Sequence, residues 1–248
     1  RQASDFGVLS LNTEGKISEF IEKPDDPDPD PNFPDQALCS MGIYIFNMSS
    51  LKNELHDAAN RADYSHDFGK DIIPWMIDRQ NVFGYVFSEK GHPCKTAYWR
   101  DVGSLDEYHA ASMDLVQPLP ELDLYDDDWP IQTLQRQRPG AKTVFNDDHR
   151  RGLAIDSVLC GGVIVSGATV NKSLLSTDVR VEENSNIDNS VLLPGSSIGS
   201  NCRLKRVIVG EACHIPNGTV IGENLSTDRD RYTVSDGGVV LVTQSMLS

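Results

Sequence analysis

The sequence has few cysteines, no long apolar run and a shortage of basic residues, and each of these absences excludes a class of protein. The five cysteines among 248 residues are odd in number and lack the paired spacing of a zinc or redox motif, so we expect free thiols in a reducing, cytoplasmic compartment. No segment approaches the apolar length of a membrane span. With 22 basic residues against 37 acidic ones, the net charge of −15 disfavours nucleic acid and anionic membranes as partners.

A repeat of aliphatic residues organises the C-terminal part of the chain. Three registers recur every 17 residues, in steps of six, six and five: Val158, Leu175, Leu192 and Val209; Ile164, Val181, Ile198 and Ile215; Val170, Ile187, Leu204 and Ile221. A fourth register holds only small side chains, as tight corners require: Ala168, Ser185, Cys202 and Thr219. A fixed period with three short sides is typical of a solenoid whose stacked coils share one core. The sequence therefore predicts a left-handed parallel β-helix with 17-residue coils over residues 152–248.

Strand, turn and helix signals alternate in residues 1–116, which predicts an α/β domain. Residues 6–22 read as a hairpin, the apolar segment 40–46 reads as a buried strand, and residues 81–87 read as a further strand. The chain opens without an initiator methionine, in what reads as the middle of a sheet, so we expect the C-terminal part of a larger domain. Four prolines mark residues 117–151 as the linker into the β-helix.

Asp101 stands where an open α/β sheet binds its ligands. It follows a segment that reads as a strand, and it precedes Gly103 and an S-x-x-E capping box, Ser104 and Glu107, that starts a helix. Ligands of open α/β sheets bind beyond the carboxyl ends of the strands, where a hard oxygen ligand suits Mg²⁺. A carboxylate that caps a turn or pairs with Arg100 fits the same spacing.

Five short motifs occur in a fixed order before the repeat. They are F-x-EKP (Phe20–Pro24), SMGIYIF (Ser40–Phe46), HDFGKDIIP (His66–Pro74), YWRDVGS (Tyr98–Ser104) and DxYxxxWPI (Asp123–Ile131). Together they resemble the C-terminal portion of the bacterial glucose-1-phosphate adenylyltransferases, or ADP-glucose pyrophosphorylases, along the whole chain. That family opens with a glycine-rich, arginine-containing loop that cradles the phosphates of ATP, and nothing in this sequence fits it.

The resemblance implies a partial Rossmann-like nucleotidyltransferase domain that converts ATP and α-D-glucose 1-phosphate to ADP-glucose and pyrophosphate, in glycogen biosynthesis. It implies Mg²⁺ as cofactor with Asp101 as a catalytic metal ligand, and Lys23 as a catalytic contact to the sugar phosphate. It adds five further contacts to glucose 1-phosphate: Glu22, Ser40, Asp67, Phe68 and Trp99. From composition alone, Lys23 reads as a surface lysine, and Phe68 and Trp99 read as core.

The resemblance also implies partners and regulation. The family is typically a homotetramer, its β-helix supplies subunit contacts and part of an effector site, and an N-terminal part outside this sequence would complete the enzyme. Relatives that respond to fructose 1,6-bisphosphate carry arginines where this sequence has Glu211, Gln244 and Ser248, so we expect weaker activation. A different effector, or three neighbouring cations, could compensate: Arg203, Lys205 and Arg206.

Two other classes of function stay open on the sequence. The chain alone could be a noncatalytic assembly or regulatory module. A β-helix of this kind also occurs in hexapeptide-repeat acyltransferases, which use a histidine beside the coils to activate the acceptor. His214 is the candidate for that role, although the long extruded loop of those enzymes is missing here.

Overall fold

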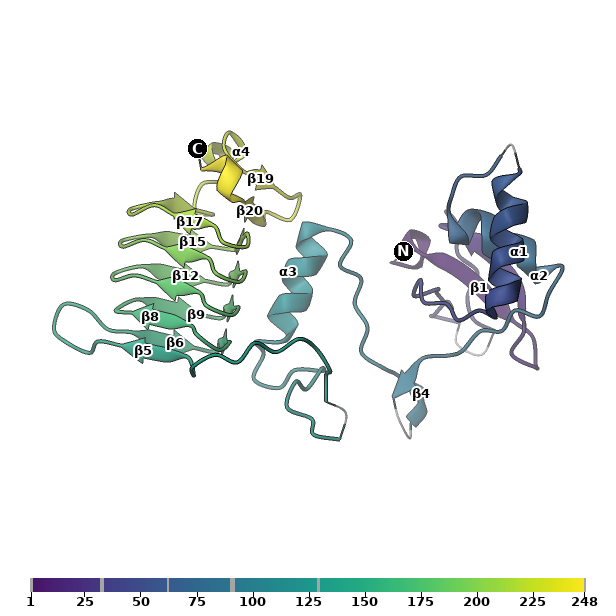
Figure 1. Ribbon diagram of the computed structural model, residues 1–248, viewed down its shortest axis with the longest axis horizontal. Coiled ribbons are helices and arrows are strands. Elements are labelled where there is room, and N and C mark those ends of the chain that lie inside the picture. Colours follow the sequence, from purple (N-terminus) through teal and green to yellow (C-terminus); the bar gives the residue numbers. More distant parts are fainter. Residues whose placement is uncertain (1, 32–33, 62, 90–91, 129, 248) are drawn as a thin grey trace. The chain divides into compact units, whose positions relative to one another are not determined.

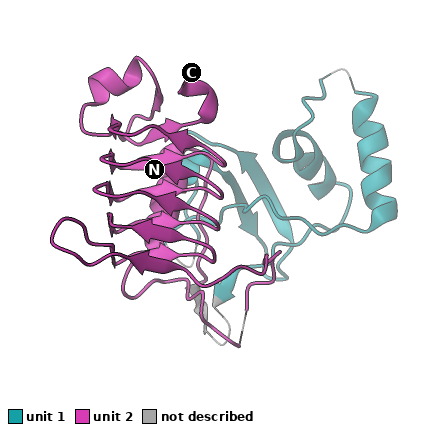
Figure 2. Ribbon diagram, turned by 60° about the vertical axis from the view of Figure 1, so that its left-hand side comes forward, with its two compact units in different colours: residues 1–96 teal, residues 97–248 magenta. Residues whose placement is uncertain are grey.

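The computed structural model describes residues 2–31, 34–61, 63–89, 92–128 and 130–247 (Figure 1). The chain divides into two compact units, residues 1–96 and 97–248 (Figure 2), and each is described by itself. None of the helices in the described ranges combines the length and the apolar composition needed to cross a bilayer.

The first unit is built on an antiparallel hairpin. β1 (Gly7–Leu11) pairs with β2 (Ile17–Glu22). The turn between them is closed by Asn12, whose Oδ1 accepts from the backbone N–H groups of Glu14 and Lys16 at 2.9 Å each. This local side-chain bonding is the reason asparagine favours turns. The predicted hairpin is therefore confirmed.

Short helices pack on the hairpin and form two small cores. The helical elements are η1 (Gln2–Asp5), α1 (Met48–Ala59), the π-helical turn η2 (Phe68–Ile72) and α2 (Ile73–Ile77). One core joins Ile17 and Phe20 of β2 to Ile73 of α2. The other packs Ala58 of α1 against Ile72 and Met76. A second hairpin, β3 (Ser88–Glu89) with β4 (His92–Thr96), ends the unit.

The strands predicted at residues 40–46 and 81–87 do not form. The second segment meets the hairpin through an isolated bridge between Lys16 and Phe83 and through backbone hydrogen bonds on either side of it. Phe46 and Val82 pack, partly buried, against the small cores, whereas Ile45 is 99% exposed and Tyr85 is 91% exposed. A run that is apolar on both faces needs cover on both faces, and the described residues of this unit cover these segments only in part. The strand predicted to lead to Asp101 likewise ends early, at Thr96.

The second unit is a three-sided solenoid of stacked strands (Figure 1). Side one consists of β5 (Lys142–Val144), β8 (Ile164–Ser166), β11 (Arg180–Val181), β14 (Ser197–Ile198) and β17 (His214–Ile215). Side two consists of β6 (Leu153–Ile155), β9 (Thr169–Asn171), β12 (Asn186–Asp188), β15 (Arg203–Lys205) and β18 (Val220–Ile221). Side three consists of β7 (Val158–Leu159), β10 (Leu174–Leu175), β13 (Val191–Leu192), β16 (Val207–Val209), β20 (Val240–Val242) and β19 (Thr233–Val234). All of these strands pair in parallel except β19, which is antiparallel to β20.

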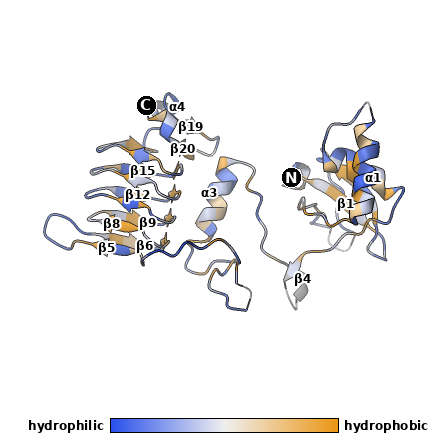
Figure 3. Ribbon diagram, in the orientation of Figure 1, coloured by the Kyte–Doolittle hydropathy of each residue, from blue (hydrophilic) through white to orange (hydrophobic). Residues whose placement is uncertain are grey.

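The inward registers are confirmed from Val170 to Ile221. Ile187 pairs with Val170 and Leu204, and Ile198 pairs with Val181 and Ile215, in neighbouring coils. These side chains form one continuous core, and most of them are completely buried. The strands in Figure 3 therefore carry both orange and blue, because inward apolar residues alternate with outward polar ones.

The first coil departs from the predicted register. Leu175 pairs with Leu159, 16 positions earlier, and Val181 pairs with Val165. The corner after Val165 is one residue shorter than its counterpart in the next coil, and Gly167 turns it with φ +65. A residue without Cβ adopts that left-handed backbone at no steric cost. The prediction that Val158 and Ile164 point inward is therefore wrong.

Side three carries apolar residues on both of its faces, which explains the ambiguity at Val158. Inner residues such as Leu192 alternate with an outer row that pairs Leu174, Val191 and Ile208 across the coils. Helix α3 (Leu105–Asp114) covers this row, with Leu105, Tyr108 and Met113 packed on Val191, Ile208 and Val239. Each coil has two consecutive apolar residues on side three, such as Val191 and Leu192, and this pairing in the sequence indicated that a helix covers the outer face.

The last coil is closed by the hairpin β19–β20 and two short helices, α4 (Leu225–Arg229) and η3 (Gln244–Met246). β20 is the last apolar strand of the chain. The boundaries predicted at residues 116 and 151 stay predictions; β5 lies within the predicted linker segment and pairs with β8.

Candidate functional site

Two predicted carboxylates come together in the first unit because two glycines leave room for them. Glu22 ends β2, and a Cβ at Gly7 would lie only 2.8 Å from its Oε2. A Cβ at Gly69 would overlap the same carboxylate. The Oδ1 atom of Asp67 accepts a hydrogen bond from the N–H of Gly69 at 2.7 Å and so lies at the same place. Glu22 and Asp67 therefore belong to one surface.

The turn that carries Asp67 is held by Asp71, which the sequence reading did not single out. The Asp71 Oδ2 accepts from the N–H of Asp67 at 3.0 Å, and from the N–H and hydroxyl of Ser65 at 2.9 and 2.8 Å. These bonds, led by the one from Asp67, hold the pKa of Asp71 below its usual range. Asp67 itself caps η2 by accepting from the N–H groups of Gly69 and Lys70. Asp71 is the second aspartate of the HDFGKDIIP motif, and its place in that motif was the sequence signal that could have identified it.

Aromatic rings join Ser40 to Phe68 on the same unit. The N–H of Ser40 donates to the carbonyl of Gly7 at 2.7 Å, and its hydroxyl lies 3.2 Å from that of Tyr44. The Tyr44 ring stacks on the Phe68 ring with centroids 5.8 Å apart. Phe68 is 36% exposed, so it is not the core residue that composition alone suggested. Tyr44 is an additional candidate that the sequence analysis did not single out.

Lys23 presents an uncompensated cation beside Glu22. Its side chain is exposed, and within the described ranges no ion pair involves it. Its backbone lies at φ +50 and its N–H donates to the carbonyl of Phe6 at 3.1 Å. A left-handed backbone costs a residue with Cβ roughly 1–2 kcal/mol, so the surrounding fold holds this bend. The bend directs the chain from β2 into the segment rich in proline and aspartate that begins at Pro24.

Trp99 and Asp101 lie in the second unit, on a segment fastened to α3. The hydroxyl of Tyr98 donates to Asp114 at 3.2 Å, and Arg100 donates to Asp114 at 2.9 Å and to Glu121 at 3.2 Å. The hydrogen bond to Asp114 raises the pKa of Arg100, so this pair is firmly charged. Arg100 is therefore engaged elsewhere, which removes the reading of Asp101 as its partner.

The surroundings of Asp101 fit a hard metal ligand. Its carboxylate is half-buried, and none of the described residues donates a hydrogen bond to it or forms an ion pair with it. A Cβ at Gly103 would lie 3.1 Å from its Oδ2, so the glycine keeps that oxygen accessible. In the part of the chain that the structure describes, no three His, Cys, Asp or Glu side chains cluster to hold a metal. Asp101 thus offers a single ligand, as suits Mg²⁺ that also binds substrate phosphates and water.

Two of the predicted effector positions lie at one edge of side three. Glu211 follows β16 and Gln244 follows β20, and the N–H of Gly210 donates to the carbonyl of Val242 at 2.8 Å between them. The Oε1 of Gln244 accepts from the N–H of His214 at 2.8 Å. Ser248 lies outside the described residues.

Most of the cations that could replace the missing arginines already bind other groups of the protein. Arg203 makes two hydrogen bonds to Glu223, at 2.8 and 3.1 Å. Arg206 donates to the carbonyl of Gly237 at 3.0 Å. Of the three, only Lys205 has a side chain without a hydrogen bond or ion pair to another described residue.

His214 lies on the outer face of side one, where its Nδ1 is 2.7 Å from the hydroxyl of Ser197. The imidazole is exposed, and it does not line the cavity described next. A histidine that activates an acyl acceptor needs a substrate site beside it. The described surroundings of His214 give no support to the acyltransferase alternative.

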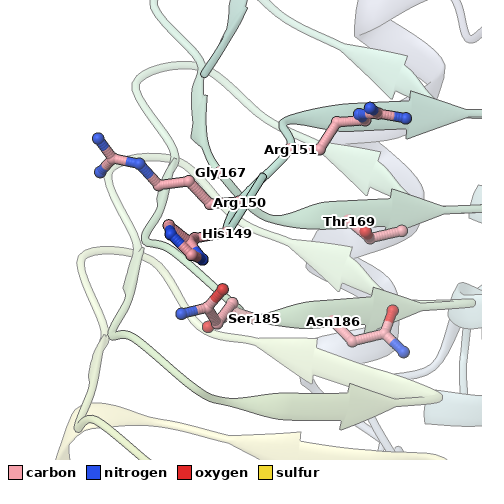
Figure 4. Close-up of a pocket in the computed structure, with 8 residues that line it drawn as sticks. His149, Arg150, Arg151, Gly167, Thr169, Ser185 and Asn186 are labelled. Carbon is pink, nitrogen blue, oxygen red and sulfur yellow. The ribbon is translucent and has the colours of Figure 1, made fainter. Parts of the chain in front are cut away.

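A cavity of about 340 Å³ opens at a corner of the solenoid (Figure 4). Its lining is polar and partly basic: His149, Arg150, Arg151, Gly167, Thr169, Asn184, Ser185 and Asn186. Arg150 donates to Asp147 at 3.1 Å and to Glu183 at 2.9 Å, and it points away from Arg151 in Figure 4. The two guanidinium groups therefore do not converge on one ligand. None of the predicted site residues lines this cavity.

Comparison with known proteins covers both units. A nucleotidyl transferase model matches residues 1–118, and a GlmU-like, C-terminal hexapeptide model matches residues 139–242. The second match confirms the left-handed β-helix, and the first confirms the nucleotidyltransferase domain.

Named relatives share close to half of their aligned residues with this chain. Glucose-1-phosphate adenylyltransferase of Methylococcus capsulatus is 51% identical over 99% of the chain, that of Methylobacillus flagellatus 47% over 100%, and that of Nitrosococcus oceani 44% over 100%. The chain spans 58% of the length of each of these relatives. With this identity along its whole length, and with both domain types in the expected order, the chain belongs to the glucose-1-phosphate adenylyltransferase family of nucleotidyltransferases.

Proposed function

We propose that the chain is the C-terminal part of an enzyme that converts ATP and glucose 1-phosphate to ADP-glucose and pyrophosphate, in glycogen biosynthesis. The observation that carries this proposal is the grouping of predicted sugar-phosphate residues in the first unit. Glu22 and Asp67 share one surface, Ser40 and Phe68 are joined through Tyr44, and the cation of Lys23 follows Glu22 directly.

The side chains in this group suit the parts of a sugar phosphate. The ammonium group of Lys23 offers a point charge and three donors to the phosphate. Glu22, Asp67 and Ser40 supply polar atoms for the sugar hydroxyls, and the Phe68 ring supplies an apolar surface for the sugar face. Trp99 is likewise proposed, from the family resemblance, as a contact to glucose 1-phosphate.

The proposed reaction is an in-line displacement without a covalent enzyme intermediate. An oxygen of glucose 1-phosphate attacks the α-phosphorus of ATP, and pyrophosphate leaves. Bound Mg²⁺ would neutralise charge on the phosphates, with Asp101 as one ligand and a second carboxylate from outside this sequence. The residues described here would hold the nucleophile in line, and such positioning alone accounts for a large part of the rate of phosphoryl-type transfers.

We propose an N-terminal part as the partner that completes the domain and binds ATP. Large apolar side chains of the first unit remain uncovered: Ile43 is 73% exposed, Ile45 99%, Phe83 62% and Tyr85 91%. Exposed apolar surface of this extent marks an interaction site, and further strands of the same sheet would cover it. We also propose a homotetramer, and a cytoplasmic setting that the free thiols support.

Two substitutions test the proposed roles in a protein that contains this chain at the full length of its relatives. Lys23→Ala should chiefly raise KM for glucose 1-phosphate, because a contact present before and during reaction is lost, whereas Asp101→Asn should chiefly lower kcat. Lys52→Ala, an exposed lysine on α1, is the control and should change neither. Equal changes of one parameter in both variants would contradict the division of roles. Unaltered kinetics in both would favour a noncatalytic module instead.

A further inference from the structure

The N-terminal half of α3 is fastened to the last hairpin of the solenoid by Asp106. Its Oδ1 accepts from the hydroxyl of Ser235 at 2.7 Å, and its Oδ2 accepts from the N–H of Gly237 at 3.0 Å. Any Cβ at Gly237 would overlap this carboxylate, so the contact requires glycine. Arg206 donates to the carbonyl of Gly237 at 3.0 Å and fixes the same turn from the coil below. These bonds hold the pKa of Asp106 below its usual range, and the hydrogen bond from Ser235 makes the largest contribution.

A second polar fastener, His109, lies one turn further along α3. It is only 5% exposed, and its Nε2–H donates to the carbonyl of Asn189 at 2.8 Å. That carbonyl belongs to a corner between coils, where Asn189 has φ +47. Apolar packing of α3 on the outer row of side three supplies the remaining contact, and Figure 1 shows the helix running alongside the coils.

The segment that carries Trp99 and Asp101 is in turn tied to α3 at both ends. At its start, Tyr98 and Arg100 bond to Asp114, in the last turn of the helix. At its end, Ser104 and Glu107 form a capping box at the first turn. Asp101 therefore lies in a short loop whose two ends are fixed on one helix, and that helix is fixed on the solenoid.

We propose that Asp106 and His109 are positioning residues, which lock α3 to the β-helix and thereby hold Asp101 in place for the transfer reaction. This inference rests on the function proposed above, in which Asp101 holds the metal. It gives the β-helix a role in the chemistry. A conformational change at the C-terminal hairpin, whose strand β20 leads to Gln244, would be transmitted through the Asp106 carboxylate to α3 and so to Asp101. No contact between the two units is needed for this coupling.

The attachment of α3 through Asp106, called the lock below, is tested on the chain itself by hydrogen exchange of the α3 amides. The variants are Asp106→Asn, Ser235→Ala and the double variant, and Asp236→Asn is the matched control because it removes an exposed charge from the same turn without touching α3. One lost bond to a charged group should raise exchange in α3 about tenfold. The double variant should exchange little faster than Asp106→Asn, because both changes remove one shared interaction. Unchanged exchange in Asp106→Asn, or strictly additive effects, would overturn the proposal.

The consequence at Asp101 is measured without turnover through its neighbour Trp99. With Trp75 and Trp129 replaced by Phe, acrylamide quenching should increase at Trp99 in Asp106→Asn and stay constant in Asp236→Asn. Equal quenching in all proteins would show that the lock does not position the segment.

In the full-length protein, Asp106→Asn should lower kcat several-fold and leave KM for glucose 1-phosphate within a factor of about two, as expected for a lost transition-state interaction. A change confined to KM would overturn the positioning role. A wild-type protein without activity would instead refute the proposed function, and the exchange and quenching results would still decide whether the lock exists.

Discussion

Ile198 offers the sharpest test of the solenoid core. It lies on β14 between Val181 and Ile215 of the neighbouring coils and is completely buried. Ile198→Ala removes three carbons from a site whose walls are fixed by the coils on either side, so we expect a loss of about 2–5 kcal/mol in the free energy of unfolding. Ile198→Asp also buries a carboxylate without a partner, which costs several kcal/mol more. That sum is comparable with the roughly 5–15 kcal/mol that stabilise a whole domain.

The assay is urea unfolding followed by far-UV circular dichroism, and the matched control is Ile155→Ala. Ile155 lies on β6 of the same solenoid and is 48% exposed, so its truncation should cost less than about 1 kcal/mol. The midpoint for Ile198→Ala should fall well below that of the control, and Ile198→Asp should leave the solenoid unfolded in buffer. Equal midpoints for the two alanine variants would refute the inward register.

Two further predictions concern pH and the effector edge. Acidification should loosen α3 in two steps. Burial and nearby Arg206 lower the pKa of His109 from its ordinary 6.5, although Asp106 opposes them, so the docking of α3 weakens below about pH 6.5. The docking weakens again as Asp106 protonates, below its ordinary pKa of 3.8. Hydrogen exchange of α3 against pH measures this, and His109→Gln should abolish the first step; a first step that persists in His109→Gln would contradict the assignment. At the effector edge, Glu211→Arg with Gln244→Arg should lower the half-saturating concentration of fructose 1,6-bisphosphate in the full-length protein, since a bisphosphate needs cations; identical titrations of wild type and double variant would rule these positions out.

The solenoid could be predicted from the sequence because its information is local. Each coil repeats the same apolar spacing, and a residue at Ile187 or Ile198 faces inward for the same reason in every repeat. The first coil misled because Val158 and Leu159 are both apolar. Both residues are half-buried on side three, so the pattern alone does not say which residue points inward.

The remaining features depend on partners far away in the chain. Segments 40–46 and 81–87 are apolar enough to be strands, but a strand forms only where a neighbour pairs with it along its length, and the described residues of the unit provide only isolated bridges there. Asp106 and Ser235 are separated by 129 positions, and His109 and Asn189 by 80. No local pattern marks such residues, so the fastening of α3 emerged only from the structure.

The most direct test of the account is pyrophosphate release from ATP and glucose 1-phosphate with Mg²⁺ present. The 248-residue chain alone should release none above a blank without glucose 1-phosphate, because Asp101 is its single proposed metal ligand and nothing in the sequence fits the loop expected to bind the phosphates of ATP. The same chain preceded by the N-terminal part found in its relatives should release pyrophosphate only when the sugar phosphate is present, and Asp101→Asn should abolish most of that release. Sugar-phosphate-dependent release by the chain alone, or full release in the Asp101→Asn protein, would contradict the account.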